Sequence, residues 1–479
     1  MSEEGVDTRE VAEGQEQHTP DPRRWRILGV TLVVGFMSLL DVTIVNVAIP
    51  SMQEGLDTST GTIQWVVSGY ALAFGLTLVA GGRLGDAYGR RRLMLIGLTG
   101  FIVSSAAVGL APNVETVIAA RLAQGATAGL LTPQNSGLIQ QLFRGPERGR
   151  AFGAFGFTVS LSSALGPVLG GAIIALAGEE QGWRWLFLVN VPIGLAALVA
   201  IAVIVPGPDR QDDSGTWIDV PGALLLGGAV LCVLFPLVSL EGGALLPLAL
   251  LLGAPAFGWG FVRWEARLGR LGRPPLLDVG LLRTLPGYST GMAIGTLYFT
   301  GFTGIFLVLS VHLQGELGLS PLMAGLLTTP FAVGAAITAP LSGRLVSRAG
   351  RTLTVVALVT MMSGTALAAW LAPGFDDGAI WMALVPCLLL AGLGGGGVIS
   401  PNFTLTLAEV PPRMGGAAGA ALQTGQRIGS SLGAALLMTT YGVAMGPFGG
   451  EGALRAALIA SLVVLSTALA AAVWSRRHE

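Results

Sequence analysis

Apolar residues run through this chain in long blocks of about twenty residues, and short polar stretches separate the blocks. A helix of about 20 apolar residues is long enough to cross the hydrocarbon core of a bilayer. The pattern therefore predicts an all-α polytopic membrane protein. The expected spans number fourteen and lie at residues 27–50, 62–82, 92–111, 115–137, 151–177, 185–205, 219–239, 243–262, 287–312, 321–344, 352–372, 378–405, 415–443 and 453–474.

Composition supports lipid as the solvent. Hydrophobic residues make up 52% of the 479 residues, charged residues only 11%, and the mean hydropathy is +0.70. A soluble domain carries roughly a quarter of its residues as charged side chains. The 71 glycines sit inside the apolar blocks, where small residues let helix backbones approach closely. The composition excludes both a soluble domain and a glycine-rich disordered chain.

Charge and reactive side chains narrow the function further. A net charge of −1 gives no reason to expect a nucleic-acid partner. The chain has two cysteines, Cys232 and Cys387, and its histidines are His18, His312 and His478. No metal or haem site can be assembled from them, so we expect no metal and no cofactor other than protons. No loop is long enough for a catalytic domain, so an enzyme is not expected.

The arginines predict the orientation of the chain in the membrane. The 27 basic residues are all arginine. If the N-terminus is cytoplasmic, all but four of them fall in cytoplasmic loops or tails, which is the expected inside bias. We therefore expect both termini in the cytoplasm. Residues 1–24 are polar and acidic and predict a disordered cytoplasmic tail; this start is too acidic, and the first apolar block too long, for a signal peptide.

An internal repeat divides the chain into two halves. Residues 82–90 read GRLGDAYGR and residues 343–351 read GRLVSRAGR, each in a turn between two apolar blocks. Repeated halves are a transporter architecture, with the substrate site between them. We expect an N-terminal six-helix bundle at 25–205, two inserted helices with a cytoplasmic amphipathic segment at 206–285, and a C-terminal six-helix bundle at 286–475.

The first copy of the repeat carries a candidate conformational gate. Two glycines pinch the turn, and an acid lies beside several arginines, which predicts charge pairs that hold one closed state and break in the other. The alternative is that the arginines only anchor the topology. The gate residues are Gly82, Asp86, Gly89, Arg90 and Arg91.

Asp41 lies inside the first apolar block, nine residues before Pro50, or about 13 Å along a helix. An isolated carboxylate in hydrocarbon costs several kcal/mol unless it is protonated or paired. Burial favours its neutral form, so Asp41 is a candidate for loading and releasing a proton. The alternative is a structural acid held by hydrogen bonds from Thr43, Asn46 or another helix.

Arg121 lies in the fourth block, at a depth similar to that of Asp41. A buried arginine stays charged and needs a partner. Arg121 is therefore expected to modulate the ionisation of Asp41. The alternative is that Arg121 donates to backbone carbonyls and braces its own helix.

Several ordered segments resemble motifs of the Major Facilitator Superfamily. Residues 82–91 are similar to its signature loop, with Ala87 in place of the usual basic residue. LDVTIVNVAIP at 40–50 resembles the helix 1 motif of the fourteen-helix drug:proton antiporters of the EmrB/QacA type. RLAQG at 121–125, LGPVLGG at 165–171 and WRWLFLVNVPIG at 183–194 resemble the helix 4, helix 5 and helix 6 motifs of the same branch.

The resemblance implies a Major Facilitator fold of two six-helix bundles plus two additional helices. It implies a proton-coupled antiporter that exports lipophilic drugs, antibiotics or related natural products across the bacterial cytoplasmic membrane by alternating access. It also links Arg121 with proton transfer. The chain is expected to act as a monomer in the lipid bilayer. The alternative is a proton-coupled uptake symporter, or an exporter of a specific metabolite, on the same fold.

The helix 5 motif implies a bend associated with antiport. Gly166 and Pro167 are expected to bend the helix because proline removes a backbone hydrogen bond, and Gly170 and Gly171 to allow close approach. A plain packing kink is the alternative.

Candidate substrate contacts are the polar and aromatic residues that could face a central cavity, where aromatic rings suit a lipophilic cation. No acid occurs at 321–344 or 415–443, so Asp41 has few substitutes. His312, at one end of its span, is a weaker candidate for proton transfer. The expected contacts are Asn46, Gln124, Arg427, Gln423, Tyr70 and Trp65.

Overall fold

The computed structural model describes residues 21–178, 181–207, 219–241, 246–271, 276, 280–372 and 379–477. Within these ranges every regular element is a helix, in keeping with the expected all-α class. The long helices are α1 (Arg24–Gly55), α2 (Thr60–Tyr88), α3 (Arg90–Gly109), α4 (Val114–Leu142), α5 (Gly145–Ala177), α7 (Asn190–Ile204), α8 (Val220–Glu241), α9 (Gly253–Arg270), α11 (Pro286–Gly315), α12 (Pro321–Ala349), α13 (Arg351–Leu371), α14 (Ile380–Thr406) and α15 (Gly415–Arg477). The short ones are α6 (Gly182–Leu188), α10 (Gly280–Thr284), η1 (Leu246–Leu252) and η3 (Pro412–Met414).

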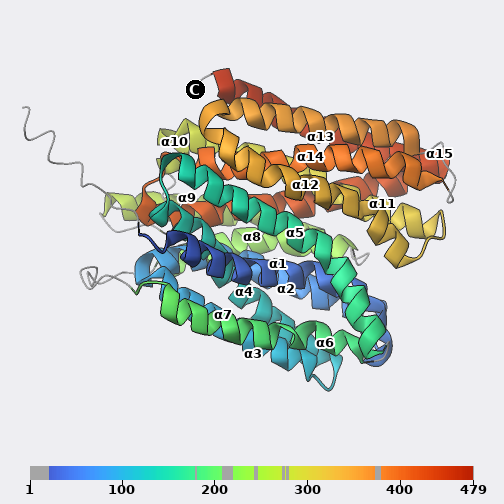
Figure 1. Ribbon diagram of the computed structural model, residues 1–479, viewed down its shortest axis with the longest axis horizontal. Helices are drawn as coiled ribbons and strands as arrows, with labels where there is room; N and C mark the ends of the chain where they lie inside the picture. The colour runs from blue at the N-terminus through green and yellow to red at the C-terminus, as the bar shows by residue number, and fades with distance from the viewer. Residues whose placement is uncertain are drawn as a thin grey trace, which may run out of the picture.

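The helices form two layers that lie side by side (Figure 1). Helices α1 to α7 make the blue-to-green layer, and α11 to α15 make the orange-to-red layer. Helix α8 contacts α2 in the first layer and α15 in the second, and α9 packs on α8. The inserted helices therefore bridge the two halves of the repeat.

Each layer has its own apolar core. In the first layer Met94, Leu98 and Phe101 are fully buried, and in the second Leu384 and Leu458 are at most 1% exposed. The outer surface is also apolar, since large side chains such as those of Leu176, Val203, Val443 and Trp370 are 73% to 89% exposed. An apolar exterior around a packed interior fits a protein surrounded by lipid. Within the described residues, ten helices are long and apolar enough to cross a membrane.

Four expected spans differ in detail from the observed helices. The span at 185–205 is split into α6 and α7 at Val189, next to Pro192, whose missing N–H cannot bond to Leu188. The span at 243–262 begins as η1 and continues as α9 through Arg270, so the first part of the expected amphipathic segment is helical. The last two spans run together as α15, which is broken at Gly449 (φ 67°, ψ −178°).

The two copies of the repeat form matching turns. The first links α2 to α3 through Gly89 (φ 91°), and the second links α12 to α13 through Gly350 (φ 50°). Both backbones lie in the left-handed region that favours glycine. The structure thus places the two halves of the repeat in equivalent turns at helix ends.

Candidate functional site

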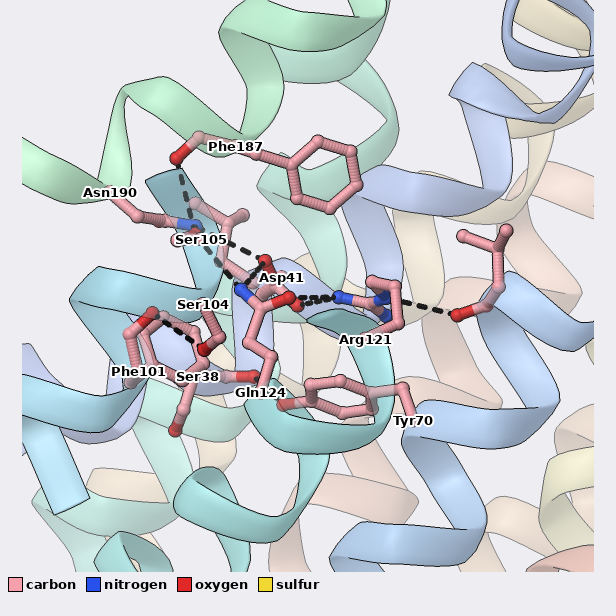
Figure 2. Close-up of polar contacts among 12 residues, drawn as sticks. Ser38, Asp41, Tyr70, Phe101, Ser104, Ser105, Arg121, Gln124, Phe187 and Asn190 are labelled. Carbon is pink, nitrogen blue, oxygen red and sulfur yellow. Dashed lines mark hydrogen bonds and ion pairs between the residues drawn. The ribbon is translucent and has the colours of Figure 1, made fainter. Parts of the chain in front are cut away.

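Asp41 and Arg121 form an ion pair in the interior of the first layer. Asp41 lies midway along α1, Arg121 lies in α4, and each residue is only 1% exposed. Arg121 Nη1 lies 2.5 Å from Asp41 Oδ2 (Figure 2). Arg121 Nε also donates a hydrogen bond of 2.9 Å to the Val66 carbonyl of α2. The common depth expected from helix geometry therefore brings the two charges into contact.

The second oxygen of Asp41 is held by two amides. Gln124 Nε2 donates to Asp41 Oδ1 over 3.0 Å, and Asn190 Nδ2 of α7 donates to the same oxygen over 3.1 Å. Both amides also donate to Ser105 Oγ of α3, over 2.9 Å and 3.0 Å. Ser105 Oγ in turn donates to the Phe187 carbonyl over 3.2 Å (Figure 2). Side chains from four helices, α1, α3, α4 and α7, thus form one buried polar network.

The chemistry of this network suits an ionised Asp41. The three side chains bonded to the carboxylate, those of Arg121, Gln124 and Asn190, all donate to it. Hydrogen bonds to the charged form of an acid favour that form. A proton on Asp41 would also remove the countercharge of Arg121, and an uncompensated buried charge is strongly unfavourable. Protonation of Asp41 therefore requires Arg121 or a helix to move.

Aromatic rings enclose the guanidinium of Arg121. Its central carbon lies 4.1 Å from the centroid of the Tyr70 ring and 5.5 Å from that of Phe187. Tyr70 is fixed by a hydrogen bond of 3.3 Å from its hydroxyl to the Ser38 carbonyl of α1. Val66 and Tyr70 lie one turn apart on the same face of α2, so this face supplies both a carbonyl and a ring to Arg121.

The candidate gate fastens one layer to the other. Asp86 Oδ1 accepts hydrogen bonds from Arg90 Nη2 (2.7 Å) and from the Gly416 N–H (3.1 Å). Asp86 Oδ2 accepts from the Ala417 N–H over 2.8 Å. Gly416 and Ala417 belong to the first turn of α15, where unpaired N–H groups and the helix dipole favour an anion. A carboxylate of α2 therefore caps a helix of the opposite layer.

Arg90 extends this contact to two more segments. It donates to the Gly137 carbonyl (2.5 Å) and to Gln141 Oε1 (2.9 Å) of α4, and to the Pro412 carbonyl (3.0 Å) of η3. The backbones also meet directly, because a Cβ placed on Gly82 would lie 2.5 Å from the Gly416 carbonyl oxygen. The layers are therefore closed against each other at the end that carries this loop, which we call the signature-loop end (residues 82–91).

The two remaining gate residues, Arg91 and Gly89, stabilise the turn and bond to no residue of the second layer in the described part of the chain. Arg91 Nη2 donates to the Ala202 carbonyl at the end of α7. Gly89 supplies the left-handed backbone between α2 and α3. Both contacts stay within the first layer.

Helix α5 packs beside the Asp41 network. A Cβ on Gly166 would lie 2.7 Å from Thr43 Cβ of α1, so this glycine permits the close approach of the two helices. Thr43 Oγ1 also donates to the Ser162 carbonyl over 3.2 Å. Gly170 is buried, whereas an added Cβ on Gly171 would meet nothing within 4 Å. Close packing therefore accounts for Gly166 and not for Gly171; the Pro167 side chain lies outside the described part.

The expected substrate contacts separate into three groups. Gln124 and Tyr70 belong to the Asp41–Arg121 network. Trp65 is 37% exposed, with its ring 5.7 Å from that of Phe235 in α8. The Asn46 side chain lies outside the described part of the chain.

Arg427 and Gln423 form the third group. Both lie on α15, where this helix meets α2 of the first layer. His312 is in the second layer, with Nδ1 3.2 Å from the hydroxyl of Tyr441.

Two members of the network, Asn190 and Ser105, are not among the expected site residues. Asn190 stands alone as a polar residue in the apolar stretch VNV, which is a signal that could have found it. Ser105 follows Ser104, whose hydroxyl bonds only within its own helix, to the Gly100 and Phe101 carbonyls. Sequence alone does not distinguish two adjacent serines of this kind.

Two layers of apolar helices, with a buried ion pair inside the first layer, define a polytopic membrane transporter. The chain belongs to the Major Facilitator Superfamily, whose family model matches residues 31–434 and 291–478. This family and the bacterial relatives below make it a transporter rather than an enzyme, and a multi-pass protein of the bacterial inner membrane.

Its relatives among known proteins include exporters and resistance proteins. The probable actinorhodin transporter of Streptomyces coelicolor is 37% identical over 428 residues, which are 88% of this chain and 73% of that protein. The puromycin resistance protein pur8 of Streptomyces alboniger is 37% identical over 427 residues, 88% of this chain and 82% of that protein. These relatives confirm the expected resemblance to drug exporters.

Two solved structures share the fold at low sequence identity. The human organic anion transporter MFSD10 (TETRAN) superimposes with a TM-score of 0.67 at 17% identity, covering 93% of this chain and all of the other. The proton:xylose symporter XylE superimposes with a TM-score of 0.65 at 17% identity, covering 94% of this chain and 95% of the other. At this identity they show the fold alone.

Proposed function

We propose that this protein is a proton-coupled antiporter that exports lipophilic antibiotics or related natural products across the cytoplasmic membrane. The observation that carries the proposal is the buried Asp41–Arg121 pair, a carboxylate whose protonation forces a rearrangement. The relatives support the direction of transport, because they include an antibiotic transporter, an antibiotic resistance protein and a resistance and export protein. Protons are the proposed coupling ion, and the functional unit is a monomer.

The proposed topology has fourteen spans with both termini in the cytoplasm. Helices α6 and α7 count as one span, and the two parts of α15 on either side of Gly449 count as two. Helices α4, α8 and α9 count as one span each, as do the remaining long helices. The proposed domains are residues 25–205, 206–285 and 286–475. The arginine-rich signature-loop end is then cytoplasmic, and the structure represents a state closed toward the cytoplasm.

The proposed cycle couples the Asp41 network to this closed end. In the closed state Asp41 is ionised and paired with Arg121. A proton that enters from outside neutralises Asp41 and frees Arg121, which destabilises the packing of α1 against α4. The contact of Asp86 with α15 then breaks, the cytoplasmic end opens, and substrate enters as the proton leaves. Rocking of the two halves around a central site gives alternating access.

The test replaces Asp41 by asparagine and measures transport in inside-out membrane vesicles. Accumulation of actinorhodin or of puromycin, the antibiotics in the names of two relatives, should be driven by an imposed pH gradient in the unmodified protein and be lost in Asp41→Asn. Asp57→Asn is the matched control: it removes the same charge at an exposed position whose φ of 46° asparagine tolerates.

Two results would overturn the proposal. Full gradient-driven accumulation in Asp41→Asn would show that the proton binds elsewhere. Accumulation in right-side-out vesicles and none in inside-out vesicles would identify an uptake symporter.

A further inference from the structure

Arg427 is a charged side chain without a polar partner at the boundary between the two layers. It lies on α15 and is partly buried, with its guanidinium carbon 4.5 Å from the centroid of the Phe74 ring of α2. Among the described residues it makes no hydrogen bond and no ion pair. None of the ion pairs in the described part therefore involves Arg427.

The buried arginines of the described part behave differently from the partly buried Arg427. Each of them donates hydrogen bonds to carbonyl or carboxylate oxygens, as a guanidinium normally does when it is buried. This holds for Arg90, Arg121, Arg148 and Arg351. Arg427 is thus not held as a structural brace in the described part of the molecule.

Gln423 adds a second free donor beside Arg427. It lies one helical turn earlier on α15, so the two side chains share a face of the helix. Gln423 is 7% exposed, and its Nε2 has no hydrogen-bond partner among the described residues. A buried donor without an acceptor costs about 1–3 kcal/mol, which a ligand that brings acceptor atoms would recover.

The surroundings of these donors are aromatic and apolar. Phe74 and Tyr70 stack with their centroids 6.1 Å apart at an angle of 23°. Thr424 and Ile428, on the same stretch of α15, line a cavity of about 250 Å³ whose other walls come from α2, α8, α9 and α11. This apolar space opens on a different face of α15 from the one that carries Arg427 and Gln423.

We propose that Arg427 and Gln423 recognise the acidic group of an aromatic substrate at the boundary between the layers. A carboxylate or phenolate takes the guanidinium fork and the amide N–H. The proposal rests on the proposed export function and specifies its substrate class. It differs from the lipophilic cation expected from the sequence, which Arg427 would repel.

The test measures binding to the purified full-length protein in detergent, with no proton gradient. The probes share one ring system and differ only in charge: anthraquinone carboxylate, its neutral carboxamide and a quaternary ammonium derivative. We expect the carboxylate to bind at least about tenfold more tightly than the ammonium probe. Arg427→Gln should weaken carboxylate binding by about ten- to a hundredfold and leave carboxamide binding within about twofold.

Two further variants make the result specific. Arg455→Gln is the matched control, because it makes the same change on α15 at a residue whose Nε bonds to the Ala369 carbonyl. Gln423→Leu should weaken carboxylate binding by about tenfold; it tests the site without removing a charge if Arg427→Gln does not fold.

Two outcomes would overturn the proposal: tighter binding of the ammonium probe, or equal loss of all three probes in Arg427→Gln. Because binding needs no gradient, these outcomes are independent of the Asp41→Asn transport test. If the probes do not bind as expected, the protein can still be an exporter of another class of substrate. If they do bind as expected, the result holds even if protons do not drive transport.

Discussion

Asn190→Leu isolates one hydrogen bond of the Asp41 network. Asn190 is 4% exposed and contacts the network only through Nδ2, which donates to Asp41 and to Ser105. Leucine has a similar size and no donor, so the change removes the hydrogen bonds without opening a large cavity. The ion pair of Asp41 with Arg121 and its bond from Gln124 stay in place.

The magnitude follows from the charge of the acceptor. A hydrogen bond to a charged group contributes about 1.5–3 kcal/mol. Asn190→Leu removes such a bond to Asp41, so the free energy of unfolding should fall by about 1.5–3 kcal/mol.

Unfolding of the purified protein in detergent measures this loss. The free energy of unfolding is compared between the unmodified protein and Asn190→Leu. Ser104→Ala is the control, because the Ser104 hydroxyl bonds only to the Gly100 and Phe101 carbonyls of its own helix. An unchanged free energy of unfolding in Asn190→Leu would refute the role assigned to these donors.

Three further changes test other contacts. Ser105→Ala removes the acceptor that positions both amides, so the free energy of unfolding should fall by about 1–3 kcal/mol, whereas Ser104→Ala should leave it nearly unchanged in the same measurement. Gly82→Ala places a Cβ 2.5 Å from the Gly416 carbonyl oxygen. This overpacking costs about 1–3 kcal/mol in the closed state and should shift the protein toward the open state. A cysteine placed between the layers should then be labelled faster. Asp86→Asn weakens charge-assisted bonds to α15 and should raise the same labelling rate about tenfold or more, and an unchanged rate would contradict the gate.

The charges of the site could be predicted from sequence because polar residues in apolar blocks are conspicuous. Asp41 and Arg121 stand out as charges within spans, and helix rise places them at a common depth. Their pairing also needs the right helix rotation, which sequence does not supply. Asn190 and Ser105 were not predicted as site residues for the same reason. A small polar residue in an apolar run bonds either to its own helix or to a neighbouring helix, and the sequence does not show which.

The internal repeat predicted equivalent turns but not equivalent contacts. Gly89 and Gly350 both take a left-handed backbone, as the shared sequence implies. Arg90 pairs with Asp86, whereas the corresponding Arg351 bonds to Asn402 Oδ1 (3.1 Å) and to the Gly287 carbonyl (3.2 Å). The second copy has Ser347 where the first has Asp86, and its arginine donates to two neutral oxygens of its own layer.

Helix α2 connects the three functional features of the molecule. Tyr70 packs on Arg121, Phe74 packs on Arg427, and Asp86 caps α15 of the opposite layer. The contact of Tyr70 depends on the charge state of Asp41, and the contact of Phe74 depends on the proposed substrate. The contact of Asp86 depends on the closure of the signature-loop end. A helix is stiff over this length, so a shift of α2 at one contact changes the others. Coupling between two sites requires an element whose position both of them bias, and α2 meets that condition with side chains four and twelve residues apart.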